Sequence, residues 1–187
     1  MAEQFFLLIQ QVYVFFFGAF MDPLFITKLV FVAFVALAML MDLIQMRIPN
    51  ILSLAVILLF PVAYLGSNMP TPFFDHLISF GVVLAAGILL FAFRILGGGD
   101  VKFMASLALW TGLDLLPAFV LIMSLVGGLQ VLLIWGLRKI APQIEFLLAK
   151  FNIILPEWLH RNGGVPYGVS IGAGVLIVFE QLPFWST

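Results

Sequence analysis

The chain has 187 residues, of which 64% are hydrophobic and only 9% are charged, whereas soluble domains carry about 25% charged residues. Such a chain cannot cover a folded surface with polar side chains, which excludes a soluble globular domain. The eight Lys and Arg residues nearly balance the nine Asp and Glu residues, which argues against a nucleic-acid partner. Because there is no cysteine, disulfides, thiolate metal sites and a cysteine nucleophile are also excluded. We therefore expect the lipid bilayer to be the solvent of this protein.

The first apolar run covers residues 5–21 and forms an N-terminal hydrophobic segment within residues 1–23. It follows Glu3 instead of a positively charged segment and lacks a good cleavage site, so we interpret it as retained and not as a signal peptide. A helix of this length spans about 25 Å, which is short of a hydrocarbon core of about 30 Å. Crossing the membrane and lying at its interface both remain open for this segment.

Six further apolar runs follow in residues 24–187, and proline and glycine residues separate them. The expected helices cover residues 24–43, 51–66, 77–96, 103–116, 118–137 and 166–182. The predicted fold is therefore an all-α integral membrane protein, a bundle of six transmembrane helices plus the additional N-terminal hydrophobic segment.

The basic residues predict the orientation of this bundle. Seven of the eight Lys and Arg residues fall in the connections 44–50, 94–102 and 138–163, and only Lys28 falls on the other side. By the positive-inside rule these three connections face the cytoplasm, whereas 67–76 faces outward. The longest of them mixes charged and apolar residues, which favours an amphipathic helix at the interface.

Two acidic residues, Asp42 and Asp100, are expected at the cytoplasmic edge of the bilayer. An ionisable group within a membrane span costs roughly 2.5 to 3.5 kcal/mol at its centre and by default indicates a functional site. Two neighbouring carboxylates can share a proton, so that one acts as a base and the other as an acid when water attacks a peptide bond. By position alone, both could equally be interfacial residues that pair with Arg47 and Lys102.

Three segments around these acids match a known pattern. Residues 42–50 read DLIQMRIPN and resemble the D-x-x-x-x-x-I-P-N motif of A24-type aspartic prepilin peptidases. Residues 97–102 read GGGDVK and resemble the G-x-G-D-V-K motif, and residues 166–174 resemble the P-Y-G opening of the last helix of that family. Because the three occur in order across residues 42–174, the chain resembles the type IV prepilin leader peptidase family, most closely its small CpaA/TadV-like form.

The resemblance implies a six-helix peptidase core over residues 24–187 and a GxGD-class aspartic endopeptidase of the bacterial inner membrane. Its catalytic residues would be Asp42 and Asp100, and its substrates would be prepilin or pseudopilin precursors of type IV pilus or secretion systems, cut at the cytoplasmic face. No cofactor and no metal are expected, and a homo-oligomer is possible. The implied substrate-binding or supporting residues are Gly97, Gly98, Gly99, Lys102, Pro49, Asn50, Pro166, Tyr167 and Gly168.

The glycines at 97–99 allow backbone conformations that are closed to other residues, and they let a substrate chain approach closely. Lys102 could stabilise a developing negative charge or bind an acidic substrate side chain. Equally, it could be an interfacial lysine that only sets topology.

The chain departs from the larger members of that family, which carry a cytosolic domain, often with four cysteines, and methylate the new N-terminus. This chain has no cysteine, and the connection 44–50 is only a few residues long. A pocket for a methyl-donor cofactor requires converging polar groups in a sizeable cavity. We therefore expect no methyltransferase activity.

Two functions of other classes stay open from the sequence. Asp42 and Asp100 could bind protons or cations in a small transporter, since acids within a membrane also mark ion pathways. Against this, the chain shows no repeat with paired broken helices. The protein could also be a catalytically silent assembly factor of a pilus or secretion system.

Three further features are expected to be structural. Ser170 lies in a G-x-S-x-G pattern, but that pattern needs a strand, a turn and a helix to form a nucleophile, and here it falls in a predicted membrane helix. Glycines at every fourth position from 164 to 172 predict close helix packing. His76 and His160 lie in predicted connections and are expected to be solvated.

The predicted orientation can be tested by thiol labelling, because the chain has no native cysteine. In intact cells we expect Arg47→Cys to be protected from a membrane-impermeant maleimide and Ser67→Cys to react with it. Both should react after the membrane is permeabilised. Labelling of Arg47→Cys from outside intact cells would reverse the orientation.

Overall fold

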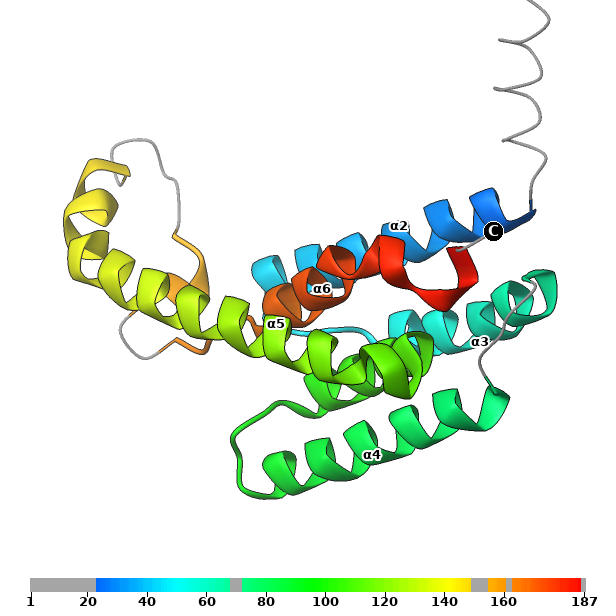
Figure 1. Cartoon of the computed structure of the whole chain (residues 1–187). Helices are drawn as coiled ribbons and strands as arrows, with labels where there is room; N and C mark the ends of the chain where they lie inside the picture. The colour runs from blue at the N-terminus through cyan, green and yellow to red at the C-terminus, as the bar shows by residue number, and fades with distance from the viewer. Residues whose placement is uncertain (1–22, 68–71, 149–154, 161–162, 186–187) are drawn as a thin grey trace, which may run out of the picture.

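The computed structural model describes residues 23–67, 72–148, 155–160 and 163–185 (Figure 1). All regular secondary structure in these residues is helical, which confirms the predicted all-α class for the described part of the chain. The α-helices are α2 (Pro23–Gln45), α3 (Asn50–Gly66), α4 (Phe73–Ala92), α5 (Gly98–Leu148) and α6 (Tyr167–Ile177). The hydrophobic segment 5–21 lies outside the described residues.

The predicted count of six transmembrane helices is not confirmed. By length and composition, three helices in the described residues could cross a membrane: α2, α4 and α5. Helix α3 has 17 residues, and α6 has only 11. At 1.5 Å per residue α6 is about 16 Å long, roughly half of a hydrocarbon core. The predicted helix 166–182 thus ends early, at Ile177, and is followed by the 3₁₀ turns η3 (Phe179–Gln181) and η4 (Pro183–Trp185).

The expected helices 103–116 and 118–137 both fall within α5, which breaks at Gly112 and not at Pro117. Gly112 has φ 62° and ψ −175°, a conformation that is essentially restricted to glycine. Met104 and Gly127 line one common cavity, although they would lie about 35 Å apart in a straight helix. The two arms of α5, residues 98–111 and 113–148, therefore fold back on each other at Gly112. Pro117 is the fifth residue of the second arm and lies inside the helix.

The longest predicted connection begins later than expected. Helix α5 continues past Arg138 to Leu148, so the connection predicted at 138–163 starts later. Residues 149–154 and 161–162 lie outside the described residues, and an interfacial helix there stays a prediction. The described part of this connection contains the 3₁₀ turn η2 (Glu157–Leu159).

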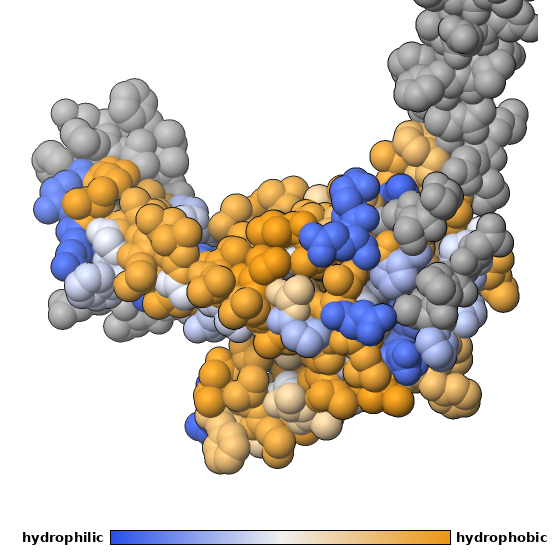
Figure 2. All heavy atoms as spheres, in the orientation of Figure 1, coloured by the Kyte–Doolittle hydropathy of each residue, from blue (hydrophilic) through white to orange (hydrophobic). Residues whose placement is uncertain are grey.

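Helix α5 forms the centre of the fold and contacts α3, α4 and α6, while α2 contacts both α3 and α6 (Figure 1). Figure 2 shows that the face in view is predominantly hydrophobic. Large apolar side chains point outward on several helices, with Leu65 85% and Phe74 71% exposed. Such a surface is stable in contact with lipid, in agreement with the composition of the chain.

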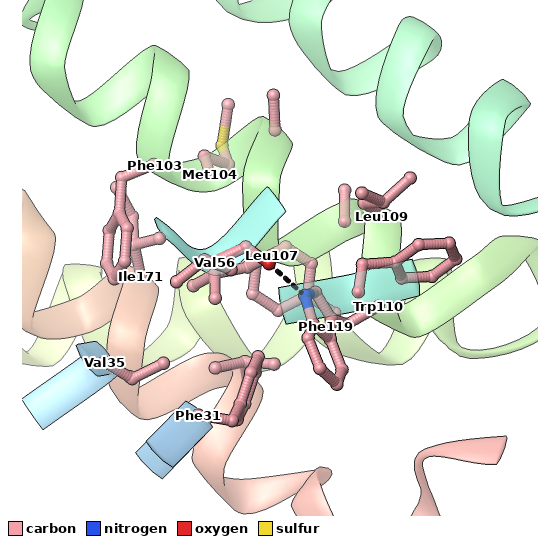
Figure 3. Close-up of a cluster of buried hydrophobic side chains, with 14 of the residues drawn as sticks. Phe31, Val35, Val56, Phe103, Met104, Leu107, Leu109, Trp110, Phe119 and Ile171 are labelled. Atoms are coloured by element: carbon pink, nitrogen blue, oxygen red, sulfur yellow. Dashed lines mark hydrogen bonds between the residues drawn. The ribbon is translucent and has the colours of Figure 1, made fainter. Parts of the chain in front are cut away.

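The buried core is built around Trp110 on the first arm of α5 (Figure 3). Its indole N–H donates a hydrogen bond to the backbone oxygen of Val56 on α3, over 3.1 Å. The ring of Phe31 on α2 lies 4.4 Å from the Trp110 ring, centroid to centroid. This one side chain therefore joins α2, α3 and α5, because its apolar body packs while its polar atom still finds a partner.

His76 is fully buried, so the prediction that it is solvated was wrong. Helix α4 begins at Phe73, several residues earlier than predicted, and this places His76 inside the helix. Its Nδ1 lies 2.8 Å from the backbone oxygen of Leu109, and its ring packs against Phe60 and Phe184. It also lies against Gly112, where an added Cβ atom would be 3.2 Å from His76 Cε1.

The break in α5 generates a stability prediction. We expect Gly112→Ala to lower the free energy of unfolding by about 1 to 3 kcal/mol, because alanine is strained in this backbone conformation. The measurement is denaturant unfolding in detergent. The control is Gly136→Ala in the same helix, where a Cβ atom meets nothing within 4 Å, and stability should stay equal or rise. Equal stabilities of the two variants would contradict the assigned role of Gly112.

Candidate functional site

Asp42 lies on the last turns of α2 and is only 4% exposed. Helix α2 ends where Met46 takes a left-handed conformation with φ 54°, and the Met46 N–H still donates to the Asp42 backbone oxygen. The chain then turns back, so that Ile48 is buried against the bundle. The end of α2 thus brings both Asp42 and Ile48 to the inside of the fold.

The Asp42 carboxylate is held by the start of α6. Its Oδ2 accepts a hydrogen bond from the backbone N–H of Gly168, over 2.7 Å, and this contact is buried. Gly168 is the second residue of α6, and the first N–H groups of a helix have no partner within it. A carboxylate is favoured at that end of a helix by the unpaired N–H groups and by the dipole. Asp42 therefore caps a helix that is remote in sequence.

A side chain at position 168 would force Ile48 and Asp42 to shift. A Cβ atom there would lie 2.7 Å from Ile48 Cδ1 and 2.9 Å from Asp42 Oδ2. Both distances are shorter than real Cβ contacts allow. The absence of a side chain lets the backbone of α6 reach the carboxylate directly.

Asp100 is the third residue of α5 and is partly buried. Its Oδ2 accepts a hydrogen bond from the Gly97 N–H over 3.2 Å, as the third residue of a capping box does. Asp100 also lines a cavity of about 670 Å³ together with Gly97, Gly164 and Tyr167.

Ile48 joins the three segments that the sequence singled out. A Cβ atom on Gly99 would lie 3.2 Å from the Ile48 backbone oxygen, and Ile48 Cδ1 lies against Gly168. Ile48 therefore sits between the glycine before Asp100 and the glycine that binds Asp42. This packing brings the end of α2, the start of α5 and the start of α6 together.

Asn50 and Lys102 form a second link between the same segments. Lys102 Nζ donates a hydrogen bond to Asn50 Oδ1 over 3.1 Å, and both side chains are exposed. One interpretation of the sequence was an ion pair between Lys102 and the Asp100 carboxylate. In the structure the partner of Lys102 is instead Asn50. Pro49 precedes α3, and Pro166 is buried directly before α6.

Two roles were expected for the glycines at 97–99, a special backbone conformation and close approach of another chain segment. Among the described glycines, Gly112 has positive φ, and residues 97–99 do not. The special backbone conformation is therefore not used here. Close approach is used at Gly99, although the neighbour is Ile48 of the same chain.

Other sequence predictions near the site are confirmed. Ser170 lies inside α6, and its hydroxyl donates to the Tyr167 backbone oxygen over 2.9 Å. The glycine stripe packs against α2 and its end, with Gly164 against Met46 and Gly172 against Met39. His160 is exposed, as expected.

Sequence reasoning missed the contribution of two polar side chains. Arg138 bonds to the backbone oxygens of Trp158, Gly163 and Gly164, and Gln130 Nε2 donates to the Pro166 oxygen. The basic charge of Arg138 was visible in the sequence, but it served only to predict orientation. Nothing in the local pattern indicates which carbonyls it would meet.

The arrangement supports acid–base chemistry. The Asp42 carboxylate is buried, and the Asp100 carboxylate lines a cavity large enough for a peptide segment. Ile48 packs between the glycines beside the two acids. Such a pair can take a proton from water and return one to a leaving group. Within the described residues, no group of three or more His, Cys, Asp or Glu side chains is placed to hold a metal ion.

A family model described as the type IV leader peptidase family matches residues 29–132, more than half of the chain. The match includes Asp42, Ile48 and Asp100, and ends before the segment that contains Gly168. No curated protein and no solved structure matches the chain.

The contact between Asp42 and Gly168 leads to a second stability prediction. Gly168→Ala should cost about 1 to 3 kcal/mol of unfolding free energy, because the added methyl group overlaps Ile48 and Asp42. Gly81→Ala on α4 is the matched control, since a Cβ atom there meets nothing within 4 Å. Unfolding in detergent distinguishes them, and an unchanged stability of Gly168→Ala would show that the close approach is not required.

Proposed function

The chain belongs to the type IV leader peptidase family, and from this premise we propose that it is a membrane aspartic endopeptidase of the GxGD class. Asp42 and Asp100 activate a water molecule that cleaves the short leader from prepilin or pseudopilin precursors. The enzyme acts at the cytoplasmic face of the bacterial inner membrane, in service of type IV pilus assembly or protein secretion. It leaves the new N-terminus unmethylated and needs no cofactor.

The observation that carries this proposal is the convergence of Asp42 and Asp100 at the ends of different helices. Asp42 is bound by the start of α6, Asp100 lies at the start of α5, and Ile48 packs between the glycines beside them. Each carboxylate also accepts a backbone hydrogen bond, which limits its rotation. Groups that are held in place before the substrate arrives need little reorganisation during the reaction.

In the proposed reaction, water lies between the two carboxyl groups, which share one proton. The ionised carboxylate takes a proton from the water, and the water oxygen attacks the carbonyl carbon of the scissile peptide bond. The protonated carboxyl group stabilises the resulting oxyanion and then supplies the proton to the leaving nitrogen. The proton belongs to the pair, so neither residue is assigned a fixed protonation state.

The cavity beside Asp100 supports access of a peptide to this pair. Its volume is about 670 Å³, and it is lined by apolar side chains such as Phe91 and Leu96 together with Arg94. A mixed lining of this kind suits a peptide that carries both polar and apolar side chains. Gly97 lines the same cavity, which leaves room for the substrate backbone near Asp100.

We predict that Asp42→Asn and Asp100→Asn each reduce cleavage by about 10² to 10⁴-fold or more, the usual contribution of a general acid or base. Asparagine keeps the size of the side chain and can still accept the backbone hydrogen bond, so both variants should insert and fold. The assay uses purified protein in liposomes with a leader-bearing precursor, and mass spectrometry of the products. Asp114→Asn is the matched control. Asp114 is exposed and lies on the second arm of α5, just after the break at Gly112.

Near-normal cleavage by either Asn variant would exclude the aspartic mechanism. Absence of cleavage by the wild-type protein with a panel of precursors would instead favour a silent assembly factor or a cation-binding role. The Asp114→Asn control identifies any loss of activity that comes from general removal of a charge.

A further inference from the structure

Arg138, on the second arm of α5, binds three backbone oxygens at once. Its Nε and Nη2 donate to the Trp158 oxygen over 3.0 and 2.8 Å. Nη2 also lies 2.6 Å from the Gly163 oxygen and 2.7 Å from the Gly164 oxygen. The guanidinium group is therefore directed at the backbone that leads into α6.

Two of these three carbonyl groups, those of Trp158 and Gly164, belong to residues that also contact the end of α2. The indole N–H of Trp158 donates to the backbone oxygen of Leu43 over 2.9 Å, and Leu43 directly follows Asp42. Gly164 lies against the Met46 side chain, so closely that a Cβ atom would be 2.7 Å from Met46 Cε. Arg138 thus binds backbone that contacts the end of α2, where Asp42 lies, and that leads into the start of α6, which binds the Asp42 carboxylate.

A guanidinium group suits this role better than an ammonium group. It is planar, always charged, and carries five N–H donors in a fixed fork, so that one side chain can serve several carbonyl groups. The carbonyl groups of Trp158 and Gly163 are partly buried, and a partly buried carbonyl group is stabilised by such a partner. A second donor from the same arm, Gln130 Nε2, binds the Pro166 oxygen over 2.8 Å.

We propose that Arg138 is a positioning residue of this peptidase, which holds residues 163–168 so that the Gly168 N–H meets Asp42 Oδ2. It acts through the backbone and not on the substrate. The inference rests on the proposed function only for its effect on catalysis. Its structural part, the dependence of the contact between Asp42 and Gly168 on Arg138, can be measured without any activity.

Lys139 provides a matched control. It is the next residue in the helix and carries the same charge, but its Nζ lies 3.7 Å from the centroid of the Trp135 ring and its side chain is exposed. Removal of its charge changes the basic character of this region as much as removal of Arg138 does. It leaves the hydrogen bonds to residues 158, 163 and 164 in place.

The test compares Arg138→Gln, Arg138→Lys and Lys139→Gln in the full chain, with kcat and KM for a leader-bearing precursor. We expect Arg138→Gln to lower kcat about 100-fold, the effect of a misplacement of about 1 Å near a reacting group. Arg138→Lys keeps the charge but loses the forked arrangement of N–H donors. Its kcat should lie between those of Arg138→Gln and the wild type, about tenfold below the wild type. KM should change less than about threefold, and Lys139→Gln should stay within about twofold in both constants.

The second measurement is amide hydrogen exchange of the peptide that contains Gly168. We expect faster exchange at Gly168 in Arg138→Gln, because its N–H loses a fixed acceptor, and unchanged exchange in Lys139→Gln. Trp158→Phe removes the indole N–H from Leu43 and should lower kcat about tenfold. Because Trp158 and Arg138 act through one linkage, the double variant should be no slower than Arg138→Gln alone.

Three outcomes would overturn the proposal: wild-type kcat in folded Arg138→Gln, wild-type kcat in Arg138→Lys, or unchanged exchange at Gly168. If Arg138→Gln does not fold, the kcat values of Arg138→Lys and Trp158→Phe test the proposal instead. Wild-type kcat in both variants would exclude the positioning role of Arg138. If the wild-type protein cleaves no precursor but exchange at Gly168 depends on Arg138, the positioning role holds and the proposed function fails.

Discussion

The buried carboxylate of Asp42 is the constraint on which the rest of this site depends. A polar group away from water must find a hydrogen-bond partner, and to leave it without one costs about 1 to 3 kcal/mol. Here the partner is the Gly168 N–H, 126 residues away in sequence. That contact combines a helix start at this place, a residue without a Cβ atom, and a turn after α2 beyond which Ile48 is buried. The ends of α2 and α6 can therefore not be arranged independently.

The middle of the bundle meets a different requirement. Where lipid surrounds a protein, burial of apolar side chains adds little, and close packing together with backbone hydrogen bonds holds helices together. Small residues permit this packing: Gly174 lies against Met123, and Gly127 lies against Ser170. Ser79 and Trp110 add hydrogen bonds to backbone oxygens of neighbouring segments. These contacts form a rigid frame that leaves the polar groups of the site at helix ends.

Both acids serve the fold as well as the proposed chemistry. Asp42 caps α6 and Asp100 caps α5, so each carboxylate is held at a helix start. Asp100 also lines a cavity. Arg138 completes this arrangement from the side of the backbone, because it fixes the carbonyl groups that precede α6. The positions of the proposed catalytic groups thus follow from helix termini, whose unpaired N–H and C=O groups must be satisfied in any case.

The sequence by itself determined the helical class, the lipid-facing exterior and the residues around which the site forms, because apolar runs and short motifs are local patterns. The tertiary structure alone decided where α5 breaks, since His76 packs against Gly112 while Pro117 fits into the second arm. It also decided the burial of His76, which depends on the Leu109 carbonyl of another helix. The three carbonyl groups bound by Arg138 could likewise not be read from the sequence, because such contacts join residues remote along the chain, and only the packing of whole helices brings them together.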